Sequence, residues 1–347
     1  MNGHVMYKDK IVGTVVDGEV LDIQPEAPQF LKRFSFLEPW LESRASDLTR
    51  THMRMILRAL RIPTLSEVKS VLFVNAVSVT DSFWFRSEDK VDLTWDEVRF
   101  KKQMFVDTSL FGDPSILQAL PEVSPELTNI GSFHKGWMLR EGKWFLAKRA
   151  TRQEAFSEIM AYKLSQHFGF DAVPYFWEEE DGLITCESFI SEGENLEHIF
   201  SWVGENTDYS DFKEVYERLG FSNQFRNLYF MDALLMNPDR HEFNTGLVTK
   251  NGKVLYMAPN FDNNLAFIST KLPDSPQRRG DLLTQDFLDE YGKQDFVLYK
   301  ETVSKILKET QEEVNSSFDL DLLLGWIMSS FGMLNNPDPF EDSTSFS

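Results

Sequence analysis

Residues 230–244, with the sequence FMDALLMNPDRHEFN, form the most informative segment of this chain. An apolar run typical of a helix turns at Asn237-Pro238, and Asp239 and Asn244 follow directly. Asp262 lies 18 residues after Asn244. Phosphoryl transfer from ATP needs one carboxylate that orients the acceptor hydroxyl, and an amide oxygen and a second carboxylate that bind Mg²⁺ on the phosphates. The order Asp, Asn, Asp in this chain fits that chemistry.

The residues between Asn244 and Asp262 predict a tight β-hairpin. Apolar runs at 245–249 and 254–257 flank the dipeptide Asn251-Gly252, which is typical of a two-residue hairpin turn. Such a hairpin returns the chain to its starting point. We therefore expect Asn244 and Asp262 to lie beside each other, as ligands of a shared metal must.

The charged and polar residues near Asp239 in the sequence are expected to have different roles. His241 is expected to brace the loop rather than act as a general base, because the Asp239 carboxylate already fills that role. Arg240 is expected to lie close to Asp239, where it keeps the carboxylate ionised or helps to neutralise transferred phosphate. Asp232 is interpreted as structural. Repulsion between Asp239 and Asp262 predicts that Mg²⁺, or alternatively Mn²⁺, binds weakly alone and firmly with nucleotide.

The composition argues against some classes of partner. The chain has 347 residues, a formal net charge of -20 and a sequence pI near 4.7. Bulk electrostatic attraction to nucleic acid or to an anionic membrane is therefore not expected. We predict no direct nucleic-acid partner and no membrane partner.

The sequence also predicts the cellular compartment of the protein. Cys186 is the single cysteine, which rules out an internal disulfide and fits a reducing compartment. No apolar run approaches the roughly 18 residues that cross a bilayer. The first ten residues lack the positive and apolar parts of a secretion signal. Together these features predict a cytoplasmic protein.

The first hundred residues predict a small mixed region. Residues 4–23 alternate in polarity and turn at Asp17-Gly18, which predicts an opening hairpin. Residues 71–79 predict a strand. Residues 48–61 predict a helix with an apolar face opposite a row of arginines, at Arg50, Arg54, Arg58 and Arg61. We interpret that row as a solvated face that meets neighbouring acids, with a phosphate-binding surface as the alternative.

A second group of residues fits the binding of nucleotide phosphates. The small pair Gly131-Ser132 would let backbone N–H groups approach phosphate oxygens closely. A predicted strand ends at Lys148, and a predicted helix at 152–169 carries Glu154 and Glu158 one turn apart. A strand lysine paired with a helix glutamate is the pattern that fixes an ammonium group against nucleotide phosphates. A surface lysine with two solvated glutamates is the alternative.

The rest of the chain predicts strands and then helices. Residues 173–177 and 183–190 predict two strands, and in a kinase-like arrangement backbone groups from Glu187 to Phe189 would read the adenine edge. Residues 262–291 are polar and irregular, as functional segments often are. Helical patterns occupy residues 191–236, 296–308 and 320–331, and residues 335–347 are expected to be a disordered tail.

The segment Asp-Arg-His-x-x-Asn at 239–244, followed by Phe261-Asp262, resembles the HipA-like serine/threonine kinases, a bacterial and phage family with a reduced kinase fold. The resemblance spans residues 125–330. It implies an α+β, two-lobed protein-kinase-like fold with a small β-rich lobe and a helical lobe. The regions expected from it are an N-terminal accessory region at 1–110, a nucleotide-binding lobe at 111–190, a helical catalytic lobe at 191–334 and the tail at 335–347.

The resemblance also implies an ATP-dependent phosphotransferase that acts on Ser or Thr of a protein, itself included. By this likeness Asp239 and His241 belong to the catalytic loop, Asp239 as the catalytic carboxylate, and Asn244 and Asp262 are the Mg²⁺ ligands. ATP is the implied cofactor, and the residues expected to bind it are Gly131, Ser132, Lys135, Lys148, Glu158, Glu187 and Phe189.

Two other functions stay open. Phosphoinositide lipid kinases have a similar loop, so a lipid or small-molecule acceptor is the second hypothesis, although no basic cluster near the site suits a membrane. The third is an inactive nucleotide-binding scaffold. HipA-like kinases are often toxins paired with a DNA-binding antitoxin and restrained by autophosphorylation of a loop serine. The resemblance thus implies an antitoxin-like partner protein and a phosphorylated Ser132.

Overall fold

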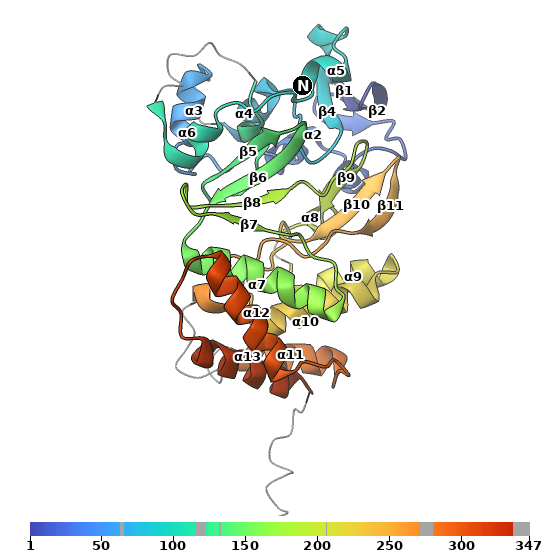
Figure 1. Cartoon of the computed structure of the whole chain (residues 1–347). Helices are drawn as coiled ribbons and strands as arrows, with labels where there is room; N and C mark the ends of the chain where they lie inside the picture. Colours follow the sequence, from blue (N-terminus) through green and yellow to red (C-terminus); the bar gives the residue numbers. More distant parts are fainter. Residues whose placement is uncertain (63–65, 115–122, 132, 206, 271–279, 336–347) are drawn as a thin grey trace, which may run out of the picture. The chain divides into compact units, whose positions relative to one another are not determined.

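The computed structural model describes residues 1–62, 66–114, 123–131, 133–205, 207–270 and 280–335 (Figure 1). The chain divides by its internal contacts into two compact units. Unit 1 consists of Met1–Arg149, Thr185–Asn206 and Gly246–Ala258, and unit 2 of Ala150–Ile184, Thr207–Thr245 and Pro259–Ser347. The consecutive regions expected from the sequence stay a prediction, because units defined by contacts and functional regions need not coincide. The expected tail lies outside the described residues after Asn335.

Unit 1 combines β-sheets with short helices. Its strands are β1 (Gly3–Tyr7), β2 (Lys10–Val16), β3 (Glu19–Leu21), β4 (Phe83–Ser87), β5 (Lys135–Arg140), β6 (Lys143–Arg149), the end of β8 (Leu183–Glu187), β9 (Asn195–His198), β10 (Gly246–Lys250) and β11 (Lys253–Met257). Its helices are α1 (Gln29–Phe34), α2 (Leu37–Glu42), α3 (Met53–Ala59), α4 (Glu67–Phe73), α5 (Trp95–Val98), α6 (Val106–Phe111) and α8 (Phe200–Val203), with 3-10 turns at Glu88–Lys90 and Pro125–Thr128.

The strands pair mostly with their neighbours in sequence. The sheets have the orders β3-β2-β1-β4, β11-β10-β9 and β5-β6-β8-β7. The pairs β1–β2, β1–β4, β5–β6 and β10–β11 are antiparallel. β9 joins β10 antiparallel although about fifty residues separate them, with Leu196 opposite Val248. A buried cluster that includes Met6, Ile56 and Trp84 fills the space between the first sheet and α3.

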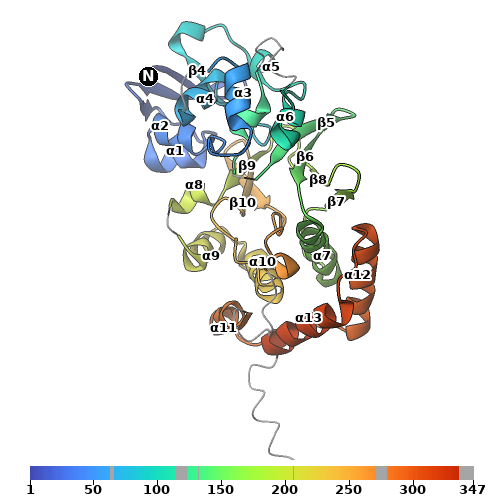
Figure 2. The same cartoon turned by 90° about the vertical axis from the view of Figure 1, so that its left-hand side faces the viewer.

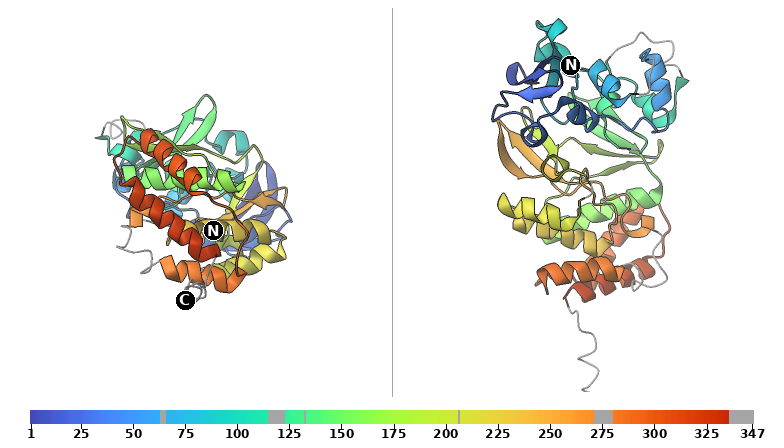
Figure 3. Two further views of the ribbon diagram at one scale, coloured as in Figure 1. Left: turned by 60° about the horizontal axis from the view of Figure 1, so that its bottom comes forward. Right: turned by 180° about the vertical axis from the view of Figure 1, so that it is seen from behind.

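Unit 2 is mainly helical. Its helices are α7 (Arg152–Phe168), α9 (Tyr209–Arg218), α10 (Ser222–Leu235), α11 (Gly280–Tyr291), α12 (Lys300–Glu313) and α13 (Leu320–Asn335), with a 3-10 turn at Phe267–Thr270, β7 (Phe176–Glu178) and the start of β8. α10 lies beside α11 and α13, and α12 beside α7 and α13 (Figures 2 and 3). Aromatic rings join these helices, as where Phe230 of α10 meets Phe168, Phe287 and Phe331.

The predicted hairpin after Asn244 is confirmed. β10 and β11 pair across the turn Lys250-Asn251-Gly252-Lys253. Asn251 and Gly252 both have positive φ, at 51° and 75°, as a type I′ turn requires. The hairpin turn at Asp17-Gly18 is confirmed as well, and so is the helix at 152–169.

Four predictions of secondary structure and exposure are wrong. Residues 262–291 are not irregular throughout, since α11 occupies Gly280–Tyr291. Residues 71–79 are not a strand, because the first of them belong to helix α4. Ser66 caps this helix by accepting from the Lys69 N–H at 3.4 Å. A short buried apolar run does not distinguish a strand from a helix. Residues 191–236 are not helical throughout, since β9 precedes the helices. Arg50 is not solvated. Its side chain is fully buried and lies 3.3 Å from Glu126.

Candidate active site

The loop that carries Asp239 begins where α10 ends. Met236 takes a left-handed conformation, with φ of 50°, and Pro238 cannot continue the helix. The Asp239 N–H then donates to Asn237 Oδ1 at 3.1 Å, a turn typical of an asparagine side chain. These local features fix the direction in which the chain leaves α10 and so place Asp239.

Asp239 and Asn244 are in direct contact. Asn244 Nδ2 donates to the Asp239 carbonyl oxygen at 2.7 Å and lies 3.3 Å from its carboxylate Oδ2. Asn244 is buried. Because the amide nitrogen is used in this way, Oδ1 is the atom of Asn244 that suits a cation.

Asp262 belongs to the same group of side chains. It has a φ of 60°, and its backbone N–H donates to the Tyr175 hydroxyl at 3.3 Å. Burial raises the pKa of the Asp239 carboxyl, the nearby His241 opposes this, and the charge of Asp262 raises that pKa further. The structure thus brings Asp239, Asn244 and Asp262 together in unit 2, as the hairpin predicted.

Arg240 ties the two loops to each other. Its guanidinium donates from Nε and Nη2 to the two carboxylate oxygens of Asp232 at 3.0 and 2.9 Å. Nη1 donates to the carbonyls of Asn244 at 2.6 Å and Phe261 at 2.7 Å. Nη2 also donates to the side chains of Asn260 and Asn263 at 2.8 and 3.0 Å.

The expectation for Arg240 holds in one part. Its charge lowers the pKa of the Asp239 carboxyl, whereas its side chain is fully buried with that of Asp232 and its nitrogens bond protein groups. Burial alone lowers the pKa of the guanidinium, but the charge of Asp232 outweighs this and the pKa lies above its ordinary value. Arg240 is a permanently charged clamp between the loops, and Asp232 is structural, as predicted.

Glu158 reaches the same loop from α7. It is fully buried, and its Oε2 accepts from the Asn263 N–H at 2.7 Å, one residue after Asp262. Glu154, one turn earlier, has another role. It accepts from the Thr151 backbone N–H at 2.6 Å in a capping box that starts the helix. The predicted pairing of Glu158 with Lys148 stays a prediction, because the two residues belong to different units.

The predicted phosphate-binding residues of unit 1 lie on β5, β6 and the loop before them. Lys148 is buried at 4% exposure, and Lys135 stands opposite it in the β5–β6 pair. Gly131 has a φ of 111°, and a Cβ built there would come within 2.6 Å of Lys135 Nζ. The lysine tip can move aside, so it is the positive φ that favours glycine at this position. Ser132 lies outside the described residues.

Two further predicted residues are Glu187, which ends β8, and Phe189, which follows it. The Glu187 side chain is partly exposed and pairs with Lys143 Nζ at 2.8 Å. The Ser188 N–H donates to the Trp144 carbonyl at 2.8 Å, so one backbone group between Glu187 and Phe189 already serves the sheet. The remaining backbone groups there are the ones that an adenine would have to use.

His241 is exposed and fits the expected role of a brace. Its Nδ1 accepts from the Phe243 N–H at 3.2 Å, and its backbone joins Asp239 and Asn244 through bonds of 2.9 Å each. The bond to Phe243 requires an unprotonated Nδ1.

Sequence reasoning missed the polar residues that support the site. In unit 1, Glu126 is fully buried. It accepts from the Trp137 N–H at 2.8 Å and pairs with Arg50, which also donates to the Asn129 carbonyl two residues before Gly131. In unit 2, Asn260 and Asn263 flank Asp262 and bond Arg240. The repeated asparagines at 260, 263 and 264 were a visible signal, whereas nothing local marked Glu126.

The residues present suit a divalent cation bound to nucleotide phosphates. Carboxylate and amide oxygens are the ligands that Mg²⁺ prefers, usually with phosphate oxygens and water completing the shell. A cation would also relieve the repulsion between Asp239 and Asp262. Among the described residues, no three His, Cys, Asp or Glu side chains are grouped to hold a metal, so a shell here needs Asn244 and ligand oxygens.

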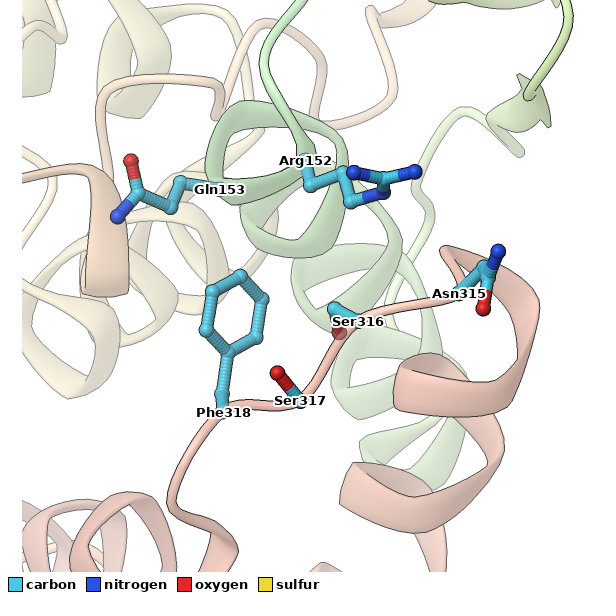
Figure 4. A pocket seen from close by; sticks show the side chains of 6 residues that line it. All are labelled: Arg152, Gln153, Asn315, Ser316, Ser317 and Phe318. Atoms are coloured by element: carbon cyan, nitrogen blue, oxygen red, sulfur yellow. The ribbon is translucent and has the colours of Figure 1, made fainter.

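A cavity of about 510 Å³ lies elsewhere in unit 2. Figure 4 shows it between the first turn of α7 and the connection from α12 to α13. Its lining consists of Arg152, Gln153, Asn315, Ser316, Ser317 and Phe318. None of the predicted site residues contributes to it.

Comparison with known proteins gives a likeness in structure alone. No family model and no curated protein matches the sequence. The HipA chain in the Shewanella oneidensis MR-1 toxin–antitoxin complex of HipA, HipB and operator DNA matches with a TM-score of 0.59 and 9% identity, over 95% of this chain and 96% of that chain. The Helicobacter pylori proinflammatory kinase CtkA matches with a TM-score of 0.39 and 15% identity, over 58% of this chain and 89% of that chain.

The first of these likenesses defines the class of fold. The chain has an α+β, protein-kinase-like fold, as the residues around Asp239 implied. More particularly, the fold is that of HipA, and it extends over nearly the whole chain. No helix within the described residues is both long and apolar enough to cross a membrane.

Proposed function

We propose that this protein is an ATP-dependent phosphotransferase of the HipA-like type that transfers the γ-phosphoryl group to Ser or Thr of a protein. The observation that carries the proposal is the contact of Asp239 with Asn244, beside Asp262, in a site closed by the buried Arg240. The HipA-like fold supports it. The cytoplasmic location predicted from composition belongs to the same proposal.

Each residue has a role that follows from its chemistry. Asp239 orients the acceptor hydroxyl and takes its proton, while Asn244 Oδ1 and Asp262 would hold Mg²⁺. Bound Mg²⁺ neutralises charge on the phosphates. Lys148 and the Gly131–Lys135 loop contribute ammonium and backbone N–H groups to the phosphates, and the backbone at Glu187–Phe189 holds the adenine. His241 keeps the loop in shape.

The test is phosphotransfer from labelled ATP with Mg²⁺ by the purified protein. We expect label on a protein acceptor or on the chain itself. Asp239→Ala and Asp262→Ala should each lower turnover by about a hundredfold or more, while the melting curves show a folded protein. Glu154→Gln, which changes a helix cap on the same unit, is the matched control and should keep most of the activity. Near-wild-type turnover in either aspartate variant would refute the roles.

Different acceptors separate the alternatives in the same assay. Label that appears on lipid or on a small molecule, and on no protein, would replace the protein-kinase proposal by the second hypothesis. Nucleotide binding without any consumption of ATP would favour an inactive scaffold. Mass spectrometry of the ATP-treated chain tests Ser132, on which we expect phosphate if the loop regulates itself.

An antitoxin-like partner is part of the proposal. The matching HipA occurs in a complex with HipB and operator DNA, and the acidic charge of -20 makes a protein a better direct partner for this chain than nucleic acid. Co-purification of the tagged protein from its own host, followed by mass spectrometry, should recover one stoichiometric DNA-binding protein. Recovery of the chain alone would remove the partner from the proposal.

A further inference from the structure

The Arg240 clamp is anchored by a residue that belongs to neither loop. Tyr209 begins α9, and its hydroxyl donates to Asp232 Oδ2 at 2.9 Å. Arg240 Nε donates to the same oxygen at 3.0 Å. Asn237 Nδ2 donates to the other oxygen at 3.1 Å. The orientation of the Asp232 carboxylate therefore depends on Tyr209 as well as on the charge of Arg240.

The ring of Tyr209 has little freedom to leave this position. It stacks on Tyr229 of α10, with the ring centroids 3.9 Å apart and the planes at 10°. A capping box of Asp208 and Asp211 fixes the first turn of α9. The phenol hydroxyl is thus presented to Asp232 by a rigid part of the fold.

The geometry of the clamp passes this constraint on to both loops. One nitrogen of Arg240, Nη1, binds the carbonyl of Asn244 at 2.6 Å and that of Phe261 at 2.7 Å. A small rotation of the guanidinium changes both distances together, and each carbonyl is on or next to a proposed metal ligand. Loss of a residue that hydrogen-bonds to a metal ligand commonly changes the metal affinity about 10–100-fold.

We propose that Tyr209 is a positioning residue that sets the separation of Asn244 and Asp262 through Asp232 and Arg240. Its role in turnover rests on the proposed function, whereas its role in holding the two loops does not. A purely structural tyrosine would change stability alone. A positioning tyrosine changes the order of residues 237–244 and 260–264 and the affinity for a divalent cation.

The experiment compares Tyr209→Phe with the matched control Tyr229→Phe, which removes a hydroxyl from the same stacked pair while leaving the donors to Asp232 in place. The first readout is hydrogen exchange of the full chain. We expect faster exchange at residues 237–244 and 260–264 in Tyr209→Phe, and wild-type exchange in Tyr229→Phe. Equal exchange in both variants would overturn the inference, whatever the activity of the protein.

The second readout is Mn²⁺ binding in the presence of ATP, followed by electron paramagnetic resonance. We expect Tyr209→Phe to bind Mn²⁺ about threefold to tenfold more weakly, a smaller effect than for direct partners of ligands. The apparent KM for Mg-ATP should rise more than kcat falls. The combined variant Tyr209→Phe with Asp232→Asn should show less than the product of the single effects, because both act through one carboxylate.

The two proposals fail in different ways. A wild-type protein that neither binds Mn²⁺ nor consumes ATP removes the proposed function, and hydrogen exchange still decides the role of Tyr209. A wild-type protein that turns over ATP, with a Tyr209→Phe variant that matches it in exchange and in Mn²⁺ affinity, removes the role of Tyr209 alone. Strictly multiplicative effects of Tyr209→Phe and Asp232→Asn would show that Tyr209 does not act through Asp232, and would also overturn the inference.

Discussion

At the residue scale, the site is a compromise between charge and stability. Asp239 and Asp262 place two negative charges in one partly buried region, which raises the pKa of Asp239 through burial and through Asp262. The charges of His241 and Arg240 oppose this rise only in part, and the guanidinium of Arg240 is paired with Asp232. The arrangement therefore costs stability unless a cation joins the two carboxylates, and this cost is typical of functional sites.

This cost predicts the effect of neutralising Asp239. In the presence of a chelator, Asp239→Asn should melt about 1–3 °C above the wild type, because the variant no longer buries a repelled carboxylate. The same variant should lose phosphotransfer. Differential scanning calorimetry gives the melting temperature of each protein in chelator and in Mg-ATP. The nucleotide should raise the melting temperature of the wild type more than that of the variant. A lower melting temperature for the variant in chelator would contradict this account.

Breaking the clamp should have the opposite effect. Arg240→Met leaves the fully buried Asp232 carboxylate without its charged partner, and removal of one member of a buried ion pair typically costs about 3–5 kcal/mol. We expect a loss of this size in the free energy of unfolding, measured with urea. The double variant Arg240→Met with Asp232→Leu should recover part of it. No recovery would mean that the loss arises from the bonds to the loops alone.

At the element scale, the hairpin between the Asn244 and Asp262 loops depends on its turn. A Cβ added at Gly252 would come within 2.2 Å of the Pro25 carbonyl oxygen, while Gly142 in the β5–β6 turn has a similar φ of 80° and open space around it. Gly142→Ala should therefore cost about 1 kcal/mol from strain alone. Gly252→Ala should cost more, and urea unfolding should separate the two. Equal losses would show that contact with Pro25 is unimportant.

The sheet that carries this hairpin contains a pH-sensitive group. Burial raises the pKa of Glu197 on β9, and the hydrogen bond from Thr249 Oγ1 only partly opposes it. Because its pKa is higher in the folded than in the unfolded protein, stability falls as pH rises above the ordinary range of a glutamate.

In the wild type the Gln29 N–H and the Thr249 hydroxyl donate to the two Glu197 oxygens. Glu197→Gln removes the pH-dependent loss, since its amide oxygen can accept from the Gln29 N–H and its amide nitrogen can donate to Thr249 Oγ1. Relative to the wild type, the variant should gain stability between pH 4.5 and pH 8. Urea unfolding at the two pH values measures the difference. A difference that stays constant with pH would exclude a raised pKa at this position.

The elements that could be predicted from sequence are those with local signals. The dipeptide Asn251-Gly252 predicted one hairpin turn, and the pattern of residues 152–169 predicted α7. The loop with Asp239 and Asn244 was predicted because both residues lie in one turn. β9 was not predicted, since its partner β10 is about fifty residues away. The pairing of Arg50 with Glu126 was missed for the same reason, as 76 residues separate them.

At the scale of the whole molecule, each compact unit is assembled from separate parts of the chain. In unit 1, the Leu196 N–H donates to the Thr80 carbonyl at 2.9 Å, and the Tyr7 hydroxyl donates to the Gly193 carbonyl at 2.8 Å. The Ser82 N–H donates to Asn195 Oδ1 at 2.9 Å. A fragment that ends at Arg149 loses all of these partners and the β9–β11 sheet.

This interleaving predicts that the fragment 1–149 does not fold cooperatively. We expect a broad thermal transition by circular dichroism and poor dispersion of its amide resonances, against a sharp transition for the full chain. Adding residues back to 258, so that unit 1 has all of its segments, should sharpen the transition. A fragment 1–149 as cooperative as the full chain would show that the later segments are dispensable for unit 1.

The most direct test of the central claim is a crystal structure of the protein with Mg²⁺ and a non-hydrolysable ATP analogue. The account predicts one Mg²⁺ held by Asn244 Oδ1, Asp262 and phosphate oxygens, with Asp239 facing the terminal phosphate and Lys148 on the phosphate chain. A nucleotide bound elsewhere, or a metal that contacts neither Asn244 nor Asp262, would contradict it.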